Sequence, residues 1–276
     1  MSWKRIRRSP LKPIEEKKKI PEIAEEVIDA SDIILEILDA RFLEETRNNV
    51  FEERIIEKGK KIIYIINKID LVNTAELKKN PKMRDLVPYV FISALKRFGI
   101  NDLRKKIKIE VKKMKLENRA VIGIVGYPNT GKSSLINLLS GKTSAKVSKE
   151  AGFTKGKQKI SLTKNIVLID TPGVIPNSFY SNVEPKSLAR QIEVGARGYD
   201  NIRSPEDVID FLMKKYPNLF EEYFKINADG DAEMLLELLG RKKKFLKKGN
   251  TVNTDRTARF ILKEWQEGKI TKFIKR

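Results

Sequence analysis

The sequence contains no cysteine and no histidine among its 276 residues. These two absences exclude a disulfide scaffold, a zinc finger, a catalytic thiol, a Ser-His-Asp triad and an imidazole general base. Any catalysis must therefore use carboxylate, hydroxyl, Lys or Arg, backbone or metal-bound groups.

Long apolar runs are also missing. The longest, residues 62–66, has five residues, whereas a membrane-spanning helix needs about 18 or more. The N-terminus is basic, but Pro10 and Pro13 stand where a secretory signal would need a continuous apolar stretch. The sequence therefore predicts a cytoplasmic protein without a membrane segment.

Positive charge is in excess and unevenly placed. Lys and Arg number 57 against 37 Asp and Glu, a net charge of +20; residues 1–20 carry +6 and residues 241–276 carry +10. One interpretation is general solubility, or the Lys and Glu enrichment of hyperthermophilic proteins. The clustering favours a polyanionic partner, because like charges repel one another unless something such as a phosphate backbone neutralises them.

The hydrophobic content of 40% is sufficient for a substantial core. Apolar runs alternate with helical patterns, and strands are expected at 33–38, 61–66, 89–92 and 120–125, with a hairpin over 157–169. A charged helix is expected after the first strand, through about Lys58. This alternation predicts a doubly wound, mostly parallel α/β sheet, whose ligands bind beyond the carboxyl ends of the strands.

The strand pattern stops beyond residue 178. Helical periodicity follows, interrupted by Pro and Gly, over residues 187–198, 205–216, 218–225, 231–242 and 255–267. The sequence therefore predicts a basic arm over 1–20, an α/β domain over 21–180 and a basic all-α domain over 181–276.

Residues 126–133, Gly-Tyr-Pro-Asn-Thr-Gly-Lys-Ser, match the phosphate-loop pattern G-x-x-x-x-G-K-[ST]. They stand between a buried strand and a helix, as the chemistry requires. The glycines let backbone N–H groups point at phosphate oxygens, Lys132 reaches the β and γ phosphates, and Ser133 offers a hydroxyl to Mg²⁺. The pattern predicts a nucleotide site, against the plainer interpretation of a Gly-rich turn.

Residues 170–173, Asp-Thr-Pro-Gly, follow the last predicted strand. Asp170 is placed to hold Mg²⁺ through water, and the Gly173 N–H to contact the γ-phosphate. Asp and Gly are common in turns, so this motif gains its meaning from the phosphate loop.

Residues 67–70, Asn-Lys-Ile-Asp, end the second strand. The Asp70 carboxylate can accept hydrogen bonds from the N1–H and amino group of guanine, which adenine lacks, and the Lys68 stem can lie along the base. The Ser93-Ala94 turn after the next strand can donate a backbone N–H to guanine O6. An ordinary strand-ending turn is the alternative for Asn67 to Asp70 alone.

The order of these motifs is unusual. In translation-factor-like GTPases, which carry the same motifs, the phosphate loop precedes the guanine-reading motif, whereas here residues 67–70 precede residues 126–133. This order indicates a circular permutation, in which the ancestral ends are joined near residues 115–119 and the chain is opened in a surface loop.

The arrangement resembles the YlqF/RbgA family of circularly permuted GTPases, which act in assembly of the large ribosomal subunit, and their archaeal and nucleolar relatives. Three more segments resemble the family: Asp39-Ala40-Arg41, Gly152 to Lys155, and Thr257 to Ile270. The resemblance implies that Thr154 completes the Mg²⁺ shell and that Asn129 binds K⁺. The residues expected to bind GTP are Asn67, Lys68, Asp70, Ser93, Ala94, Asn129, Thr130, Gly131, Lys132, Ser133, Ser134, Asp170 and Gly173.

Catalysis is expected to involve Lys132, Thr154 and Gly173, with Mg²⁺ at Ser133, Thr154 and Asp170. Ras-like enzymes place a water-orienting Gln after the Asp-x-x-Gly motif, but Val174 follows Gly173 here. Some family members use a histidine, and this sequence has none. We therefore expect slow hydrolysis of GTP to GDP, accelerated by the ribosomal partner.

The expected partners of this monomer are GTP, GDP, and the large ribosomal subunit or its precursor through rRNA. Arg241, Lys242, Lys243, Lys244, Lys247 and Lys248 are expected to contact rRNA phosphates. Two alternatives remain from the sequence: a signalling or transport GTPase with a protein partner, and an RNA-binding module in which the nucleotide is a structural ligand.

Overall fold

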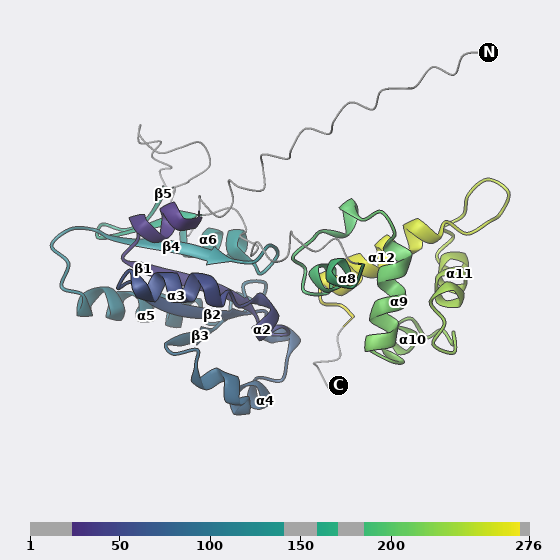
Figure 1. Ribbon diagram of the computed structural model, residues 1–276, viewed down its shortest axis with the longest axis horizontal. Coiled ribbons are helices and arrows are strands. Elements are labelled where there is room, and N and C mark those ends of the chain that lie inside the picture. The colour runs from purple at the N-terminus through teal and green to yellow at the C-terminus, as the bar shows by residue number, and fades with distance from the viewer. Residues whose placement is uncertain (1–23, 141–158, 171–184, 271–276) are drawn as a thin grey trace, which may run out of the picture.

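The computed structural model describes residues 24–140, 159–170 and 185–270 (Figure 1). Six strands form one sheet in the order β3-β2-β1-β4-β6-β5. Every neighbouring pair is parallel except β5 and β6. The strands are β1 (Ile33–Asp39), β2 (Lys61–Asn67), β3 (Tyr89–Phe91), β4 (Ala120–Gly126), β5 (Lys159–Thr163) and β6 (Ile166–Asp170). The predicted mostly parallel sheet is confirmed.

Apolar side chains cover both faces of this sheet, as parallel strands with helical crossovers require. Alternate residues of β1 enter different clusters: Ile33 and Leu35 pack on one face, and Ile34 packs on the other. The surrounding helices, preceded by a helix over residues 24–30, are α2 (Leu43–Thr46), α3 (Asn49–Glu57), η1 (Ile69–Leu71), α4 (Thr74–Lys79), η2 (Pro81–Arg84), α5 (Ile100–Lys113) and α6 (Lys132–Ser140).

The charged helix predicted after β1, through about Lys58, is α3, which ends at Glu57; the short helix α2 precedes it. Asn48 separates them. Its side chain caps α3 by accepting a hydrogen bond from the Phe51 N–H at 3.3 Å, and its own N–H donates to Glu36 at 3.0 Å. A capping Asn with non-helical backbone begins a new helix.

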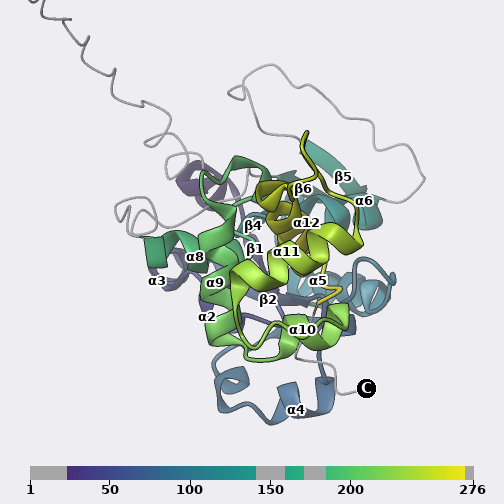
Figure 2. The ribbon, with the colours of Figure 1, turned by 90° about the vertical axis from the view of Figure 1, so that its right-hand side faces the viewer.

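The C-terminal region is helical, as predicted. It comprises α8 (Pro185–Glu193), η3 (Tyr199–Asn201), α9 (Pro205–Lys215), α10 (Leu219–Phe224), α11 (Ala232–Lys242) and α12 (Thr254–Gln266). These helices lie together at one end of the long axis, and Figure 2 looks onto them with β1 and β4 behind. The helix predicted over 187–198 ends earlier, at Glu193, because Gly195 adopts a left-handed φ of 74°.

One apolar cluster joins the helical region to the sheet. Trp265 of α12 is buried and stacks on Tyr216 and Phe220, with ring centroids 5.2 and 5.8 Å away. The same cluster contains Phe42, from the loop after β1, and Tyr127, from the phosphate loop. The helical region is therefore packed directly on the phosphate loop and on the loop after β1.

A buried carboxyl group under α3 gives folding a pH dependence. Burial, with the nearby Glu52 charge, raises the pKa of Glu36 to about 8. The folded state therefore binds this proton more tightly than the unfolded state, where the pKa is near 4.5. The resulting stabilisation is complete below pH 4.5 and is lost as pH rises through about 8.

We predict that Glu36→Gln removes this dependence, because the amide oxygen can still accept the Asn48 N–H without carrying charge. Between pH 5 and 9, the free energy of unfolding of the wild type should fall by a few kcal/mol more than that of the variant. Urea unfolding at several pH values measures it. Equal pH slopes in both proteins would contradict the assignment.

Candidate functional site

A cavity of about 840 Å³ lies at the carboxyl ends of β2 and β4. Nine of the residues predicted to bind GTP line it: Asn67, Lys68, Asp70, Ala94, Asn129, Gly131, Lys132, Ser133 and Ser134. The helical region contributes Gly198, Tyr199, Asp200, Gln266 and Glu267. The cavity is thus walled by both parts of the chain.

The phosphate loop has a backbone that only glycine fits at two positions. Gly131 has φ 102°, and a Cβ there would lie 2.2 Å from Nδ2 of Asn67. Gly126 has φ 149°, and its Cβ would lie 2.7 Å from the Ile37 carbonyl oxygen. These close approaches place the loop against the ends of β1 and β2.

Lys132 crosses the phosphate loop from the first turn of α6. Its Nζ donates to the Gly126 carbonyl oxygen at 3.0 Å and also bonds the Tyr127 carbonyl. The loop carbonyls thus hold the ammonium group at the cavity wall, from which a phosphate oxygen can take over its hydrogen bonds.

Asn67 ties three motifs together. Its Nδ2 donates to the Thr130 carbonyl at 2.7 Å, and its Oδ1 accepts the Ala94 N–H at 3.0 Å. Ser93 and Thr130 are buried and are absent from the cavity lining. Ser93 instead shapes its turn, since its Oγ accepts the Lys96 N–H at 3.0 Å.

Asp70, in η1, carries the clearest sign of a ligand-binding role. Its Oδ1 is buried and has no hydrogen-bond partner within the described part of the chain, while the side chain lines the cavity. A desolvated acceptor without a donor is costly. The N1–H and amino group of a guanine base are the donors that would satisfy this carboxylate.

Lys68 is held by a buried ionic cluster. Its Nζ lies 2.8 Å from Oδ2 of Asp39. The Arg41 guanidinium donates to both oxygens of the same carboxylate, from Nη2 to Oδ2 at 2.8 Å and from Nε to Oδ1 at 3.0 Å. Burial alone would raise the pKa of Asp39, but Lys68 and Arg41 lower it below its usual value. Burial in turn lowers the pKa of Lys68. The carboxylate thereby fixes the lysine that flanks the base position.

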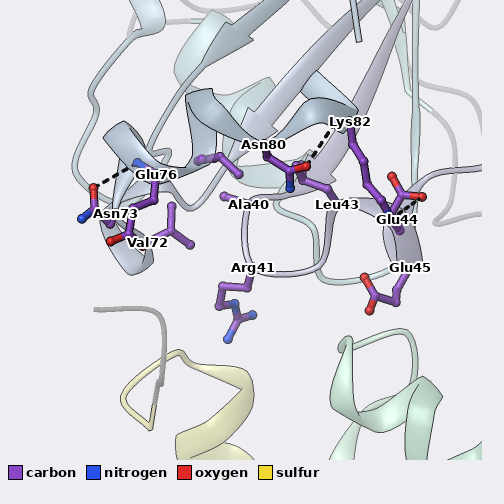
Figure 3. A pocket seen from close by; sticks show the side chains of 11 residues that line it. Ala40, Arg41, Leu43, Glu44, Glu45, Val72, Asn73, Glu76, Asn80 and Lys82 are labelled. Carbon is purple, nitrogen blue, oxygen red and sulfur yellow. Dashed lines mark hydrogen bonds and ion pairs between the residues drawn. The ribbon is translucent and has the colours of Figure 1, made fainter. Parts of the chain in front are cut away.

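Arg41 extends this cluster to the helical region (Figure 3). Its Nη1 donates to the Trp265 carbonyl oxygen at 3.2 Å. A smaller groove of about 440 Å³ lies beside Arg41, between α2 and α4. The end of β1 is therefore linked both to the base-binding loop and to the end of α12.

The phosphate loop touches the helical region as well. Nδ2 of Asn129 donates to the Gly195 carbonyl at 2.8 Å. The side-chain amide of Asn129 is thus already engaged in a bond between the two parts, and its binding of K⁺ stays a prediction.

Asp170 is the one of the three predicted residues Thr154, Asp170 and Gly173 that lies within the described residues. Thr154 and Gly173 lie outside the described residues. Asp170 ends β6, where its backbone pairs with Ile124, two residues before the phosphate loop. A hydroxyl at Ser133 and a carboxylate at position 170 form a donor set that suits Mg²⁺, which takes one or two protein ligands together with phosphates and waters.

Sequence reasoning missed the wall formed by the helical region. For Thr257 to Ile270 the sequence predicts only a family resemblance and an apolar face. Gly268 lies against Leu71, because a Cβ there would come within 2.3 Å of that side chain. The available signal in the sequence is a glycine that follows an amphipathic helix, but this signal does not show which surface the segment contacts.

The permuted strand order, the phosphate loop at the start of α6 and the unpartnered Asp70 oxygen define the class: a circularly permuted P-loop protein with a guanine-nucleotide site. The family model described as 50S ribosome-binding GTPase matches residues 121–245. The match begins at β4 and omits the preceding guanine motif, as a permuted order requires.

Sequence relatives extend the match to nearly the whole chain. A GTP-binding protein of Methanocaldococcus jannaschii is 41% identical over 92% of this chain and 67% of its own length. Nucleolar GTP-binding protein 2 of Neurospora crassa is 35% identical over 90% of this chain, and that of Saccharomyces cerevisiae 32% over 90%. The chain spans 40% and 51% of these two nucleolar proteins.

Solved structures show the same fold. The GNP-bound YlqF of T. maritima has a TM-score of 0.63 at 22% identity, covering 92% of this chain and 96% of that one. A GDP-bound YlqF structure gives 0.61 at 23% identity, covering 91% and 97%. The chain belongs to the family of GTP-binding proteins that includes the Methanocaldococcus jannaschii relative, and it has the circularly permuted GTPase fold of YlqF.

We predict that Asp70→Asn abolishes preference for guanine. The amide cannot accept both guanine donors, so GDP affinity should fall roughly 10- to 100-fold, the worth of one charge-assisted hydrogen bond. Competition of GDP, ADP and xanthosine diphosphate against a fluorescent nucleotide measures it. Xanthosine diphosphate should bind the variant more tightly than it binds the wild type, because its C2 carbonyl accepts a hydrogen bond from the new amide. Asp102→Asn, an exposed carboxylate outside the cavity, is the control; unchanged GDP preference in Asp70→Asn would contradict the role.

We predict that Asp39→Asn destabilises the protein by about 3–5 kcal/mol, because it leaves the buried Arg41 and Lys68 cations without their counter-charge. GDP affinity should fall in the same variant, since Lys68 loses its anchor. Urea unfolding and nucleotide titration test both effects. Asp29→Asn, which removes an exposed carboxylate, should change neither, and wild-type behaviour of Asp39→Asn would refute the cluster's role.

Proposed function

We propose that this protein hydrolyses GTP to GDP and phosphate and acts as an assembly factor for the large ribosomal subunit, binding rRNA in a nucleotide-dependent way. The observation that carries the proposal is the cavity wall shared by the nucleotide motifs and the helical region. The family description and the nucleolar relatives support the ribosomal role.

Hydrolysis requires a water oxygen to bond the γ-phosphorus while the bond from that phosphorus to the β–γ bridging oxygen breaks. The loop N–H groups and Lys132 stabilise charge on the phosphate oxygens. Ser133, Asp170 and Thr154 would hold Mg²⁺, and Asn129 would hold K⁺; these ions would supply further positive charge beside the phosphate oxygens. With Val174 where Ras-like enzymes carry a Gln, the isolated protein turns over slowly, and the ribosomal partner orders the site.

Three contacts transmit a change of bound nucleotide to the helical region. Arg41 bonds the Trp265 carbonyl, Asn129 bonds the Gly195 carbonyl, and Tyr127 packs in the helical core. A change in the phosphate loop or the base loop therefore alters contacts with α8 and α12. A GTP-dependent shift between two domain arrangements follows, with rRNA gripped in the triphosphate state and released after hydrolysis.

The rRNA contact is assigned to the basic turn between α11 and α12. Leu246 and Val252 pair across it, and Phe245 packs on Phe260 at 5.6 Å. This packed base supports Lys244, Lys247 and Lys248, which are exposed. Such a row of cations suits phosphates of structured RNA.

The protein is proposed to act as a cytoplasmic monomer. Among the helices that the structure describes, none is long and apolar enough to cross a membrane.

We predict that large ribosomal subunits cosediment with the protein more strongly when it carries a non-hydrolysable GTP analogue than when it carries GDP. The double variant Lys247→Glu, Lys248→Glu should bind the subunits at least about tenfold more weakly at low salt. The slope of log affinity against log salt concentration should become shallower by about 1.5 to 2. Nucleotide affinity should stay unchanged.

The matched control reverses two exposed lysines on α4, Lys78→Glu with Lys79→Glu, for the same change in net charge. Equal binding of the GTP-analogue and GDP forms would refute nucleotide dependence. Equal loss in the α4 control would refute the turn as a specific contact. Hydrolysis that is fast without subunits would refute activation by the partner.

A further inference from the structure

Helix α5 carries an unusual stripe of lysines. Lys105, Lys108 and Lys112 are exposed and spaced by three and four residues, which places them along one face of the helix, and the exposed Lys115 follows just after its C-terminal end. None of them forms an ion pair with any residue in the described ranges. Like charges at this spacing destabilise a helix in isolation.

The neighbouring face of α5 is built differently. Glu110 is buried and pairs with Lys61, with Lys113 at 3.2 Å and with Lys106 at 3.4 Å. The hydrogen bond from Lys61 is the main reason that the pKa of Glu110 falls to about 2. One face therefore neutralises its lysines within the fold, while the stripe does not.

The stripe borders a groove. A cavity of about 730 Å³ lies between the end of α5 and the β5–β6 turn, and Lys108, Lys112, Lys115 and Arg119 line it against one carboxylate, Glu117. Arg119 is positioned there because its Nη2 donates to Oγ of Ser161 at 2.9 Å. The groove is thus a concave surface with four cations.

Two ordinary explanations cover only part of this arrangement. Cations near a helix C-terminus interact favourably with the helix dipole, which accounts for Lys112 and Lys115. Lys105 and Lys108 stand earlier in α5, outside the last turn, so the dipole does not account for them. Random surface charge would not leave one face paired and the other unpaired.

We propose that this groove, lined by Lys108, Lys112, Lys115 and Arg119, is a second RNA-binding surface that grips the phosphate backbone of structured RNA. The inference rests on the proposed rRNA binding and adds a contact made by the GTPase domain itself. In Figure 1 the connection from α5 to β4 lies at the opposite end of the long axis from α11. The protein then holds RNA at both ends, so release from one end leaves it tethered by the other.

The test uses the full chain with a fluorescein-labelled RNA duplex and with purified large ribosomal subunits. Lys108→Glu with Lys112→Glu should weaken RNA binding at least about tenfold at 50 mM salt and reduce the log–log salt slope by about 1.5 to 2. GDP affinity should be unchanged, which shows that the variant is folded. Combining it with Lys247→Glu and Lys248→Glu should reduce the slope further.

The α4 pair, Lys78→Glu with Lys79→Glu, has the same charge change and should retain wild-type binding. If the α5 variant binds RNA no worse than this control while the Lys247 and Lys248 variant loses affinity, the second surface is refuted and the proposed function stands. If the wild-type protein binds neither RNA nor subunits in either nucleotide state, the proposed function fails with it.

Discussion

The buried Asp39 carboxylate is the constraint on which the two-part structure depends. A charge in this position is stable only with close counter-charges, and it takes them from Arg41, two residues onward, and from Lys68, at the end of the next strand. Arg41 then reaches the Trp265 carbonyl in the helical region. One carboxylate therefore fixes the lysine of the guanine motif and the guanidinium that fastens α12.

Permutation makes this connection useful. The base-reading loop now precedes the phosphate loop, and the helical region follows β6 in the chain, yet it returns to contact both loops. Asn129 and Tyr127 attach it to the phosphate loop, while Gly268 packs beside Asp70 through Leu71. The candidate nucleotide site consequently lies at the interface between the two loops and the helical region.

The sequence predicts the sheet and the nucleotide motifs because both depend on local patterns. Apolar runs ending in Asn67 and Gly126 place the two loops at one sheet edge, and Gly131 has the backbone that its motif demands. The contacts from Asp39 to Lys68 and from Arg41 to Trp265 were not predictable, because they join residues far apart in the chain. The break at Asn48 was missed since its cap contacts Glu36, a residue of another element.

The two basic surfaces, the α5 groove and the turn between α11 and α12, lie at opposite ends of the molecule, with the nucleotide cavity between them. The measurement that tests this account most directly is a crystal structure of the protein with GDP. We expect the guanine N1–H and amino group on Asp70, the β-phosphate on Lys132 and the loop N–H groups, and Gln266 still at the cavity wall. A nucleotide bound elsewhere, or a guanine edge that leaves Asp70 unpartnered, would contradict the account.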